Sequence, residues 1–309
     1  MAPLRSGTVV NVSLLILVNA MWAAQYSAYK TATSQMGPVT VSTWTFLFAT
    51  LILLPFLFRD HWKRVRTPRR WARRDWIGFS VIGVFGLIPA SAFLAWGTDH
   101  STASNASLIY LTVPILTALL ASMILGERMT RMRWISLAIS LVGVLLLSRS
   151  DLSQQSLTHS RFLMGNVLVL LACASSSFYN VYSKELLGRF NELEVLVYGY
   201  SLALAISIPL LLWVEPITWD AIRAYTLATW LSVGVLSFFS WGLAMVLWMF
   251  VLKRIDVSQA SVSIYLLPFL GVLISALTLH EKITMPMIVG GAITLVGAVL
   301  ITATEAPAA

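Results

Sequence analysis

Residues 104–143 decide the fold, because the chain contains this stretch twice. They read SNASLIYLTVPILTALLASMILGERMTRMRWISLAISLVG, and residues 258–297 read SQASVSIYLLPFLGVLISALTLHEKITMPMIVGGAITLVG. An offset of 154 residues places Pro114 on Pro268, although only 11 of the 309 residues are proline. The same offset pairs Lys30 with Lys184, Pro55 with Pro209, Trp76 with Trp230, Phe85 with Phe239 and Glu127 with Glu281. Chance explains these matches poorly, so we predict that the chain is a tandem duplication.

The composition is typical of a membrane protein. Hydrophobic residues make up 58% of the chain and charged residues 11%, whereas soluble domains carry roughly 25% charged residues. The single cysteine, Cys173, excludes a disulfide framework and a multi-cysteine metal site. The net charge of +8 does not indicate a nucleic-acid partner, because its richest cluster, residues 59–74, lies between apolar segments and suits anionic lipid headgroups. The first apolar run, from Val9 towards Lys30, lacks a cleavage site and is expected to be a retained span.

Ten apolar segments reach roughly the 20 residues that a helix needs to cross a bilayer. They are too long and too little alternating to be strands. Five fall in residues 1–150 and five in residues 151–309, and no long linker separates these halves. We therefore predict an all-α membrane protein in which two five-helix repeats form one domain. The expected spans are residues 9–30, 39–58, 76–97, 104–125, 132–149, 163–184, 193–214, 228–251, 258–279 and 285–303.

An odd number of spans in each repeat predicts that the two copies cross the membrane in opposite senses. With the N-terminus inside, 16 of the 21 Lys and Arg residues lie on the cytoplasmic side and five on the other side. The positive-inside rule therefore predicts that both termini are cytoplasmic. Inverted repeats of this kind are a signature of transporters.

The repeated stretch resembles the EamA-type members of the drug/metabolite transporter superfamily. The resemblance covers nearly the whole chain, including the ten helices and the duplication. It implies a carrier in the inner membrane, with a central cavity lined mainly by helices 1, 3, 4, 6, 8 and 9. His280 stands where the first copy has Gly126, so the halves are not expected to be equivalent in function. The matching segments are residues 107–114, 125–127 and 141–143 in the first copy, and 261–268, 281 and 295–297 in the second.

Two stripes of polar and aromatic side chains are the candidate binding surface. Helix 1 carries Asn19, Trp22, Gln25, Tyr26 and Tyr29, and helix 6 carries Cys173, Ser176, Ser177, Tyr179, Asn180 and Ser183. Polar groups cannot face lipid unsatisfied, so these stripes either join helices or line a wet cavity. The mixture of amide and aromatic groups favours a substrate lining. Trp241, on helix 8, fits either the lining or an interfacial belt. The expected substrate-binding residues are Asn19, Trp22, Tyr26, Asn105, Tyr110, Tyr179, Asn180, Trp241, Gln259 and Tyr265.

Two residue pairs are candidates for gating. Lys30 and Lys184 end the first helix of each half, where they either extend to the headgroups or control access to the substrate. Pro114 and Pro268 lie inside helices 4 and 9 and are expected to kink them, either as fixed bends or as hinges.

No acidic residue or histidine falls in the middle of a predicted span, which argues against a proton relay within the membrane. The chain also lacks the HExxH and GxSxG motifs of hydrolases, so no catalytic residue, metal site or cofactor is expected.

These patterns predict a carrier that moves a small organic metabolite, amino-acid-like, drug-like or related, out of the cell by alternating access. A lipid-linked or nucleotide-sugar substrate is the alternative within transport. A membrane interaction protein that transports nothing is the alternative outside transport. The expected partners are the small-molecule substrate and membrane lipids, and a homodimer stays an option.

Overall fold

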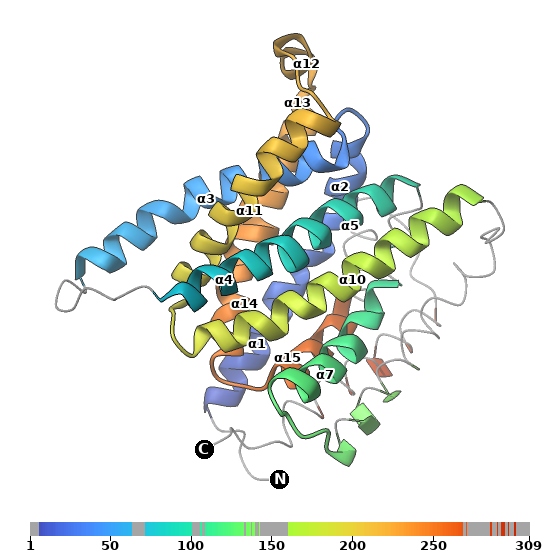
Figure 1. Cartoon of the computed structure of the whole chain (residues 1–309). Coiled ribbons are helices and arrows are strands. Elements are labelled where there is room, and N and C mark those ends of the chain that lie inside the picture. The colour runs from blue at the N-terminus through green and yellow to red at the C-terminus, as the bar shows by residue number, and fades with distance from the viewer. Residues whose placement is uncertain are drawn as a thin grey trace.

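The computed structural model describes residues 6–63, 72–100, 109–132 and 160–267 almost continuously. It also describes positions 106, 134–136, 138, 139, 142, 270, 285, 289, 292, 293, 296 and 300. Within this described part every regular element is a helix (Figure 1). The prediction of an all-α protein is confirmed for these residues.

Six helical segments are long and apolar enough to cross a membrane. They correspond to predicted spans 1, 2, 3, 6, 7 and 8, and the chain is a multi-pass membrane protein. A shorter apolar helix, Tyr110–Ile124, covers part of predicted span 4. Spans 5 and 10 fall largely outside the described residues and span 9 is described only in its first half, so the count of ten stays a prediction. The six segments are Val9–Thr33, Pro38–Asp60, Arg73–His100, Leu163–Leu187, Glu192–Val214 and Leu227–Leu252.

Several spans are divided into more than one helical element. The helical elements of the first half are α1 (Ser6–Ala23), α2 (Gln25–Thr33), α3 (Pro38–Lys63), α4 (Arg73–Val81), the π-helix η1 (Ile82–Leu87), α5 (Ile88–His100), the 3₁₀ turn η2 (Tyr110–Thr112) and α7 (Val113–Ile124). In the second half they are α10 (Ser160–Leu187), α11 (Glu192–Val214), α12 (Trp219–Ala224), α13 (Leu227–Gly234), the π-helix η3 (Val235–Leu243), α14 (Ala244–Leu252), α15 (Val257–Ser261) and the 3₁₀ turn η4 (Val262–Tyr265).

The irregular elements recur at the offset found in the sequence. Moving η1 by 154 residues gives positions 236–241, which lie within η3. Moving η2 by the same number gives positions 264–266, which overlap η4. π-helices are rare in proteins, and those that occur are often found at functional sites. Their recurrence indicates that the two halves share their local distortions as well as their sequence pattern.

The helices of the two halves also exchange contacts. The first span of each half packs against the third span of the other, since α10 lies along α5 (Figure 1) and α1 packs on α14. The two second spans, α3 and α11, pack on each other. Such exchange is what a two-fold arrangement of two copies produces. The inverted orientation in the membrane stays a prediction.

Glycines permit a close approach between α5 and α10. A β-carbon added to Gly97 would lie 2.6 Å from Val169 Cγ2 and 2.8 Å from the carbonyl oxygen of Gly165. A β-carbon added to Gly165 would lie 3.0 Å from the carbonyl oxygen of Gly97. Each glycine thus leaves space for the backbone of the other helix. Small residues have this role at many helix interfaces in membranes.

Carboxylates from each half cap helices of the other half. Glu215 accepts hydrogen bonds from two backbone N–H groups in the first turn of α3, at 2.8 and 3.2 Å, and from Thr40 Oγ1 at 2.8 Å. Glu127 accepts from two N–H groups in the first turn of α15, at 2.9 and 3.1 Å, and from Ser258 Oγ at 2.6 Å. These bonds satisfy N–H groups that have no partner within the helix.

An ion pair with a buried carboxylate adds a further connection between the halves. Arg189 donates from Nη1 to Asp75 Oδ1, and from Nη2 to Asp75 Oδ2 at 3.2 Å. Asp75 Oδ2 also accepts the backbone N–H of Ala72, 2.9 Å away, at the start of α4. The Asp75 side chain is completely buried, whereas the Arg189 side chain is 34% exposed. Close by in sequence, Asn191 Nδ2 donates to Asp60 Oδ2 at 2.9 Å.

The predicted orientation can be tested with reporter fusions. A reporter that is active only in the cytoplasm, fused after residue 66, 158 or 309, should be active, inactive and active respectively. A reporter active only outside the cytoplasm should give the opposite pattern and serves as the control. The expectation follows from five spans per half and the excess of basic residues on one side. Cytoplasmic activity of the fusion at residue 158 would contradict the inverted arrangement.

Candidate substrate-binding site

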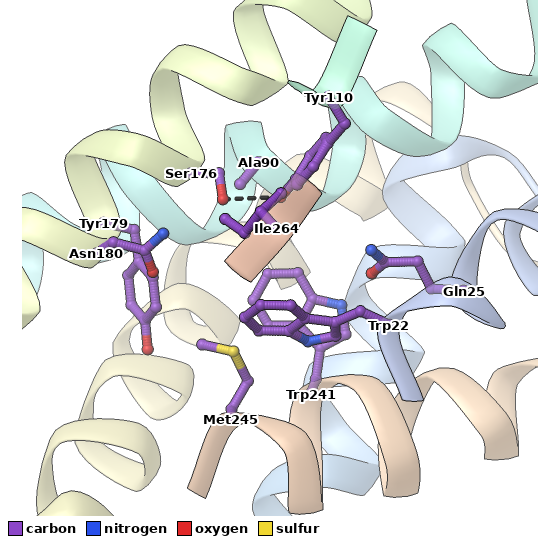
Figure 2. Close-up of a pocket in the computed structure, with 10 residues that line it drawn as sticks. All are labelled: Trp22, Gln25, Ala90, Tyr110, Ser176, Tyr179, Asn180, Trp241, Met245 and Ile264. Carbon is purple, nitrogen blue, oxygen red and sulfur yellow. Dashed lines mark hydrogen bonds between the residues drawn. The ribbon is translucent and has the colours of Figure 1, made fainter. Parts of the chain in front are cut away.

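A small cavity lies between the two halves (Figure 2). Space for the centre of a water molecule extends over about 30 Å³, which is room for only a few waters at about 10–15 Å³ each. None of its lining residues is charged. They are Trp22, Gln25, Ala90, Tyr110, Ser176, Tyr179, Asn180, Trp241, Met245 and Ile264.

The cavity lies where the helices depart from regular α-geometry. Trp22 and Gln25 stand on either side of the break between α1 and α2. Tyr110 and Ile264 lie on the 3₁₀ turns η2 and η4, and Trp241 lies on the π-helix η3. These irregular turns change the direction of side chains along each span. They allow residues from six spans to meet around one space.

Trp22 contributes an aromatic wall, and its indole N–H already has a hydrogen-bond acceptor in the protein. Its Nε1 donates to the carbonyl oxygen of Ser240 at 3.2 Å. Its ring packs on Trp248, with ring centroids 5.1 Å apart. The Tyr110 ring, which also lines the cavity, meets the Tyr26 ring edge-on, with centroids 6.0 Å apart. These contacts fix the rings of the wall from behind.

A chain of hydrogen bonds fixes Trp241. Its Nε1 donates to the hydroxyl of Tyr29 at 3.0 Å, and this hydroxyl lies 3.0 Å from Ser91 Oγ. Ser91 Oγ donates to Ser42 Oγ at 2.9 Å, and Ser42 Oγ donates to the carbonyl oxygen of Pro38 at 2.8 Å. Because Ser91 gives its only proton to Ser42, Tyr29 must donate to Ser91. The chain crosses four spans and leaves no free N–H on Trp241.

The remaining polar groups of the cavity are amides and hydroxyls. Asn180 Oδ1 accepts a hydrogen bond from Trp248 Nε1 at 3.0 Å, and the Tyr110 hydroxyl bonds Ser176 Oγ at 2.8 Å. Figure 2 shows the amide of Gln25 extending towards the space between Tyr110 and Trp22. The cavity therefore combines aromatic faces with two carboxamides and has no fixed charge.

The amides occupy exchanged positions in the two halves. Gln25 and Tyr26 follow each other in the first half, and Tyr179 and Asn180 stand 154 residues later. The tyrosine of each pair is thus the repeat equivalent of the amide of the other pair. The fold repeats, but the chemistry of the lining does not.

The EamA-like transporter family matches residues 10–149 of the chain and matches again over residues 163–303. The chain belongs to this family. It is accordingly a small-molecule transporter.

Named relatives extend over most of the chain. A probable terminal-alkyne amino-acid exporter of Streptantibioticus cattleyicolor is 27% identical over 287 residues, which are 93% of this chain and 91% of that protein. An uncharacterized transporter of Archaeoglobus fulgidus is 26% identical and covers 94% of this chain and 97% of its own length. A crystal structure with 21% identity has the same fold, with a TM-score of 0.71 over 96% of both chains.

The structure of this EamA-like transporter brings five of the ten predicted binding residues to the cavity. These are Trp22, Tyr110, Tyr179, Asn180 and Trp241. Asn105 lies outside the described residues. Asn19 is completely buried away from the cavity, where its Nδ2 donates to Leu15 O at 2.7 Å and to Ser263 Oγ at 2.9 Å. It therefore joins helices.

Three other predicted residues do not line the cavity. Tyr26 packs behind Tyr110 and is 4% exposed. Gln259 is buried on α15. Tyr265 belongs to a separate apolar cluster with Leu111 and neighbouring residues of η4 and α7. The sequence pattern thus selected buried positions for these three residues, but not positions that reach the cavity.

The structure gives the two lysines a capping role outside the cavity. Lys30 Nζ donates to two carbonyl oxygens in the last turn of α5, at 3.0 and 3.1 Å. Lys184 Nζ donates to the carbonyl oxygens of Leu252 and Ile255, the second at 2.7 Å, at the end of α14. Cations at helix C-termini are favourable because the last carbonyl groups have no partner within the helix. A gating role for either lysine stays a prediction.

The expected kink at Pro114 has a different form. Pro114 lies in the first turn of α7, directly after the 3₁₀ turn η2, and not in a helix interior. A proline there removes an N–H that the first turn does not need. The change of direction is therefore a change from 3₁₀ to α-helix. Pro268 lies outside the described residues, and the hinge stays a prediction for both.

Sequence reasoning did not select half of the lining. Ser176 and Gln25 belong to the predicted stripes but were not among the expected binding residues. Ile264 could have been found, because it is the repeat equivalent of Tyr110. Ala90 and Met245 carry no polar signal, and only their packing places them at the cavity.

Proposed function

We propose that this EamA-like chain exports a small amino-acid-like metabolite across the cytoplasmic membrane by alternating access, with both termini in the cytoplasm. The observation that carries the proposal is the cavity between the halves, which combines aromatic faces with the amides of Gln25 and Asn180. Selective sites for small molecules are typically apolar pockets with a few placed polar groups.

The uncharged lining favours a small neutral or zwitterionic molecule over a polyanion. A nucleotide sugar would bring phosphates that need basic partners, and no Lys or Arg lies among the lining residues. Amide groups can bond a carboxylate or an amine, and the faces of Trp22 and Trp241 suit an apolar side chain. The name of the relative in Streptantibioticus cattleyicolor, a probable amino-acid exporter, supports the same substrate class and the outward direction.

The small volume of the cavity supports alternating access. Room for a few water molecules is too little for an amino acid, so the lining must separate before a substrate can bind. The two halves exchange contacts through α1, α5, α10 and α14, and a rotation of one half against the other would open one side at a time. The irregular turns η2 and η3 lie at the cavity and offer places for this bending.

The proposal predicts a change in the metabolites outside the cell. Cells that express the chain should accumulate a specific small metabolite in the medium compared with cells that lack it, measured by mass spectrometry. Trp22→Ala and Asn180→Ala should each lower this export by up to about tenfold, because each removes a direct contact with the substrate. Both variants should still insert and elute as folded protein.

The control is a polar residue directly after the first membrane span that does not reach the cavity. Ser34→Ala changes an exposed hydroxyl at the end of α2, which bonds the carbonyl oxygen of Thr31, and should leave export unchanged. Unchanged export in both cavity variants would place the substrate elsewhere. No difference in the medium for any metabolite would contradict export itself.

A further inference from the structure

Trp248 lies behind the cavity and contacts two of its walls. Its side chain is completely buried on α14. Its ring packs on Trp22, with centroids 5.1 Å apart, and its Nε1 donates to Asn180 Oδ1 at 3.0 Å. Trp248 therefore connects the wall from α1 to the wall from α10.

This hydrogen bond determines which end of the Asn180 amide faces the cavity. The indole N–H is a donor and never an acceptor, so the atom opposite it must be the amide oxygen. Turning the amide over would set its NH₂ group against the indole N–H. A buried N–H left without an acceptor disfavours that orientation by roughly tenfold to a hundredfold. Figure 2 shows the Asn180 side chain extending from α10 towards the cavity.

The other indole groups of the site are turned away from the substrate space. Trp22 donates to the carbonyl oxygen of Ser240, and Trp241 donates to the Tyr29 hydroxyl. Their rings therefore present aromatic surface to the cavity and no N–H group. The NH₂ group of Asn180 is left as a fixed donor on its side of the cavity.

We infer that Trp248 is a positioning residue that holds Asn180 as a hydrogen-bond donor, and that the transported molecule presents an acceptor, a carboxylate or carbonyl oxygen, to Asn180. This inference rests on the proposed function, since it assigns the chemistry of one end of the same substrate. A molecule with only an ammonium group at this end would meet N–H donors and bind more weakly.

Two compounds with the same alkyne chain test the inference. L-Propargylglycine has a carboxylate, and but-3-yn-1-amine is the same molecule without it. Transport of each is measured by mass spectrometry with the full-length protein in liposomes. The wild type should prefer the amino acid by about tenfold or more, the usual effect of one hydrogen bond to a charged acceptor. Trp248→Phe keeps an aromatic ring but removes the indole N–H, so the Asn180 amide can turn over and present its oxygen to the cavity. The preference for the amino acid should then fall by at least about threefold, mainly through faster transport of the amine.

Asn180→Asp provides the complementary change. The aspartate can still accept from Trp248, but it replaces the NH₂ group with an oxygen, so the preference should reverse towards the amine. The matched control is Trp44→Phe, which removes a buried indole N–H that has no acceptor in the described part of the chain. Trp44 does not line the cavity, and its variant should keep the wild-type preference.

The outcomes separate this inference from the proposed function. If Trp248→Phe slows both compounds by the same factor, Trp248 is only a packing residue and the inference is wrong. The inference is also wrong if the wild type carries the amine as well as the amino acid. If the wild type carries neither compound, the proposed substrate class fails, and the acceptor group assigned here fails with it.

Discussion

Gly97→Leu is expected to remove nearly all folded transporter from the membrane. A β-carbon at Gly97 would already lie 2.6 Å from Val169 Cγ2 and 2.8 Å from the carbonyl oxygen of Gly165. Backbone atoms of α10 cannot rotate away, so the two helices would have to separate. Overpacking of this kind typically costs about 1–3 kcal/mol and more where the backbone must move. We expect a cost above about 3 kcal/mol for leucine, seen as loss of the monodisperse peak in size-exclusion chromatography of detergent extracts.

Two further glycine variants calibrate this prediction. Gly97→Ala should give an intermediate loss, because it adds only the β-carbon. Gly234→Ala is the matched control, since a β-carbon there has no neighbour within 4 Å. It should be neutral or stabilising by up to about 1 kcal/mol through its helix propensity. Normal yields of Gly97→Leu would mean that α5 and α10 do not approach as closely as the structure places them.

Arg189→Ala is expected to destabilise the protein by roughly 3 kcal/mol. It leaves the Asp75 carboxylate, whose side chain is completely buried, without its positive partner. Removing one member of a buried ion pair typically costs about 3–5 kcal/mol, because the remaining charge stays desolvated. The lower end applies here, since the Arg189 side chain is 34% exposed. The measurement is the free energy of unfolding from a denaturing-detergent titration.

A second ion pair supplies the control for Arg189→Ala. Lys253 Nζ lies 3.0 Å from Glu192 Oε1, and the Lys253 side chain is 37% exposed. Exposed pairs contribute about 0.2–1 kcal/mol, so Lys253→Ala should have a small effect. Asp75→Asn combined with Arg189→Ala should recover part of the loss, because no buried charge is then left unpaired. Equal effects of Arg189→Ala and Lys253→Ala would show that the Asp75 carboxylate is hydrated.

Hydropathy predicted the described spans closely. Predicted span 39–58 corresponds to Pro38–Asp60, and predicted span 193–214 corresponds to Glu192–Val214. Local signals explain this agreement: Asn191 caps α11 with a reciprocal bond to Glu194, which the sequence pattern Asn-x-x-Glu allows. The break after Ala23 and the π- and 3₁₀-helices were not predicted. Pro89 and Pro114, each two residues after η1 and η2, are local signals for a break in the helical hydrogen bonding there. No proline stands at the break after Ala23 or at η3.

The site could be predicted only in part, because contacts between spans decide which side chains reach the cavity. Helical spacing correctly grouped the side chains of helix 1 into one stripe, but it could not separate Gln25, which lines the cavity, from Asn19, which bonds Ser263. Both are amides on the buried side of the span. Which of them meets a cavity depends on the partner helix at that depth. Trp248 gave no signal in its own helix, because its hydrogen bond to Asn180 crosses between spans.

The exchanged order of Gln25–Tyr26 and Tyr179–Asn180 has a consequence for the kinetics of transport. In the proposed cycle the halves swap conformations as the carrier turns from one face of the membrane to the other. Identical linings would make these two open states equal in free energy and in affinity. With different linings, the half-saturating substrate concentration differs between the two faces. For a carrier that uses no driving ion, detailed balance then requires that the maximal rates differ by the same factor. Such a carrier saturates at a low substrate concentration on one face and at a high substrate concentration on the other, while its net flux still follows the substrate gradient.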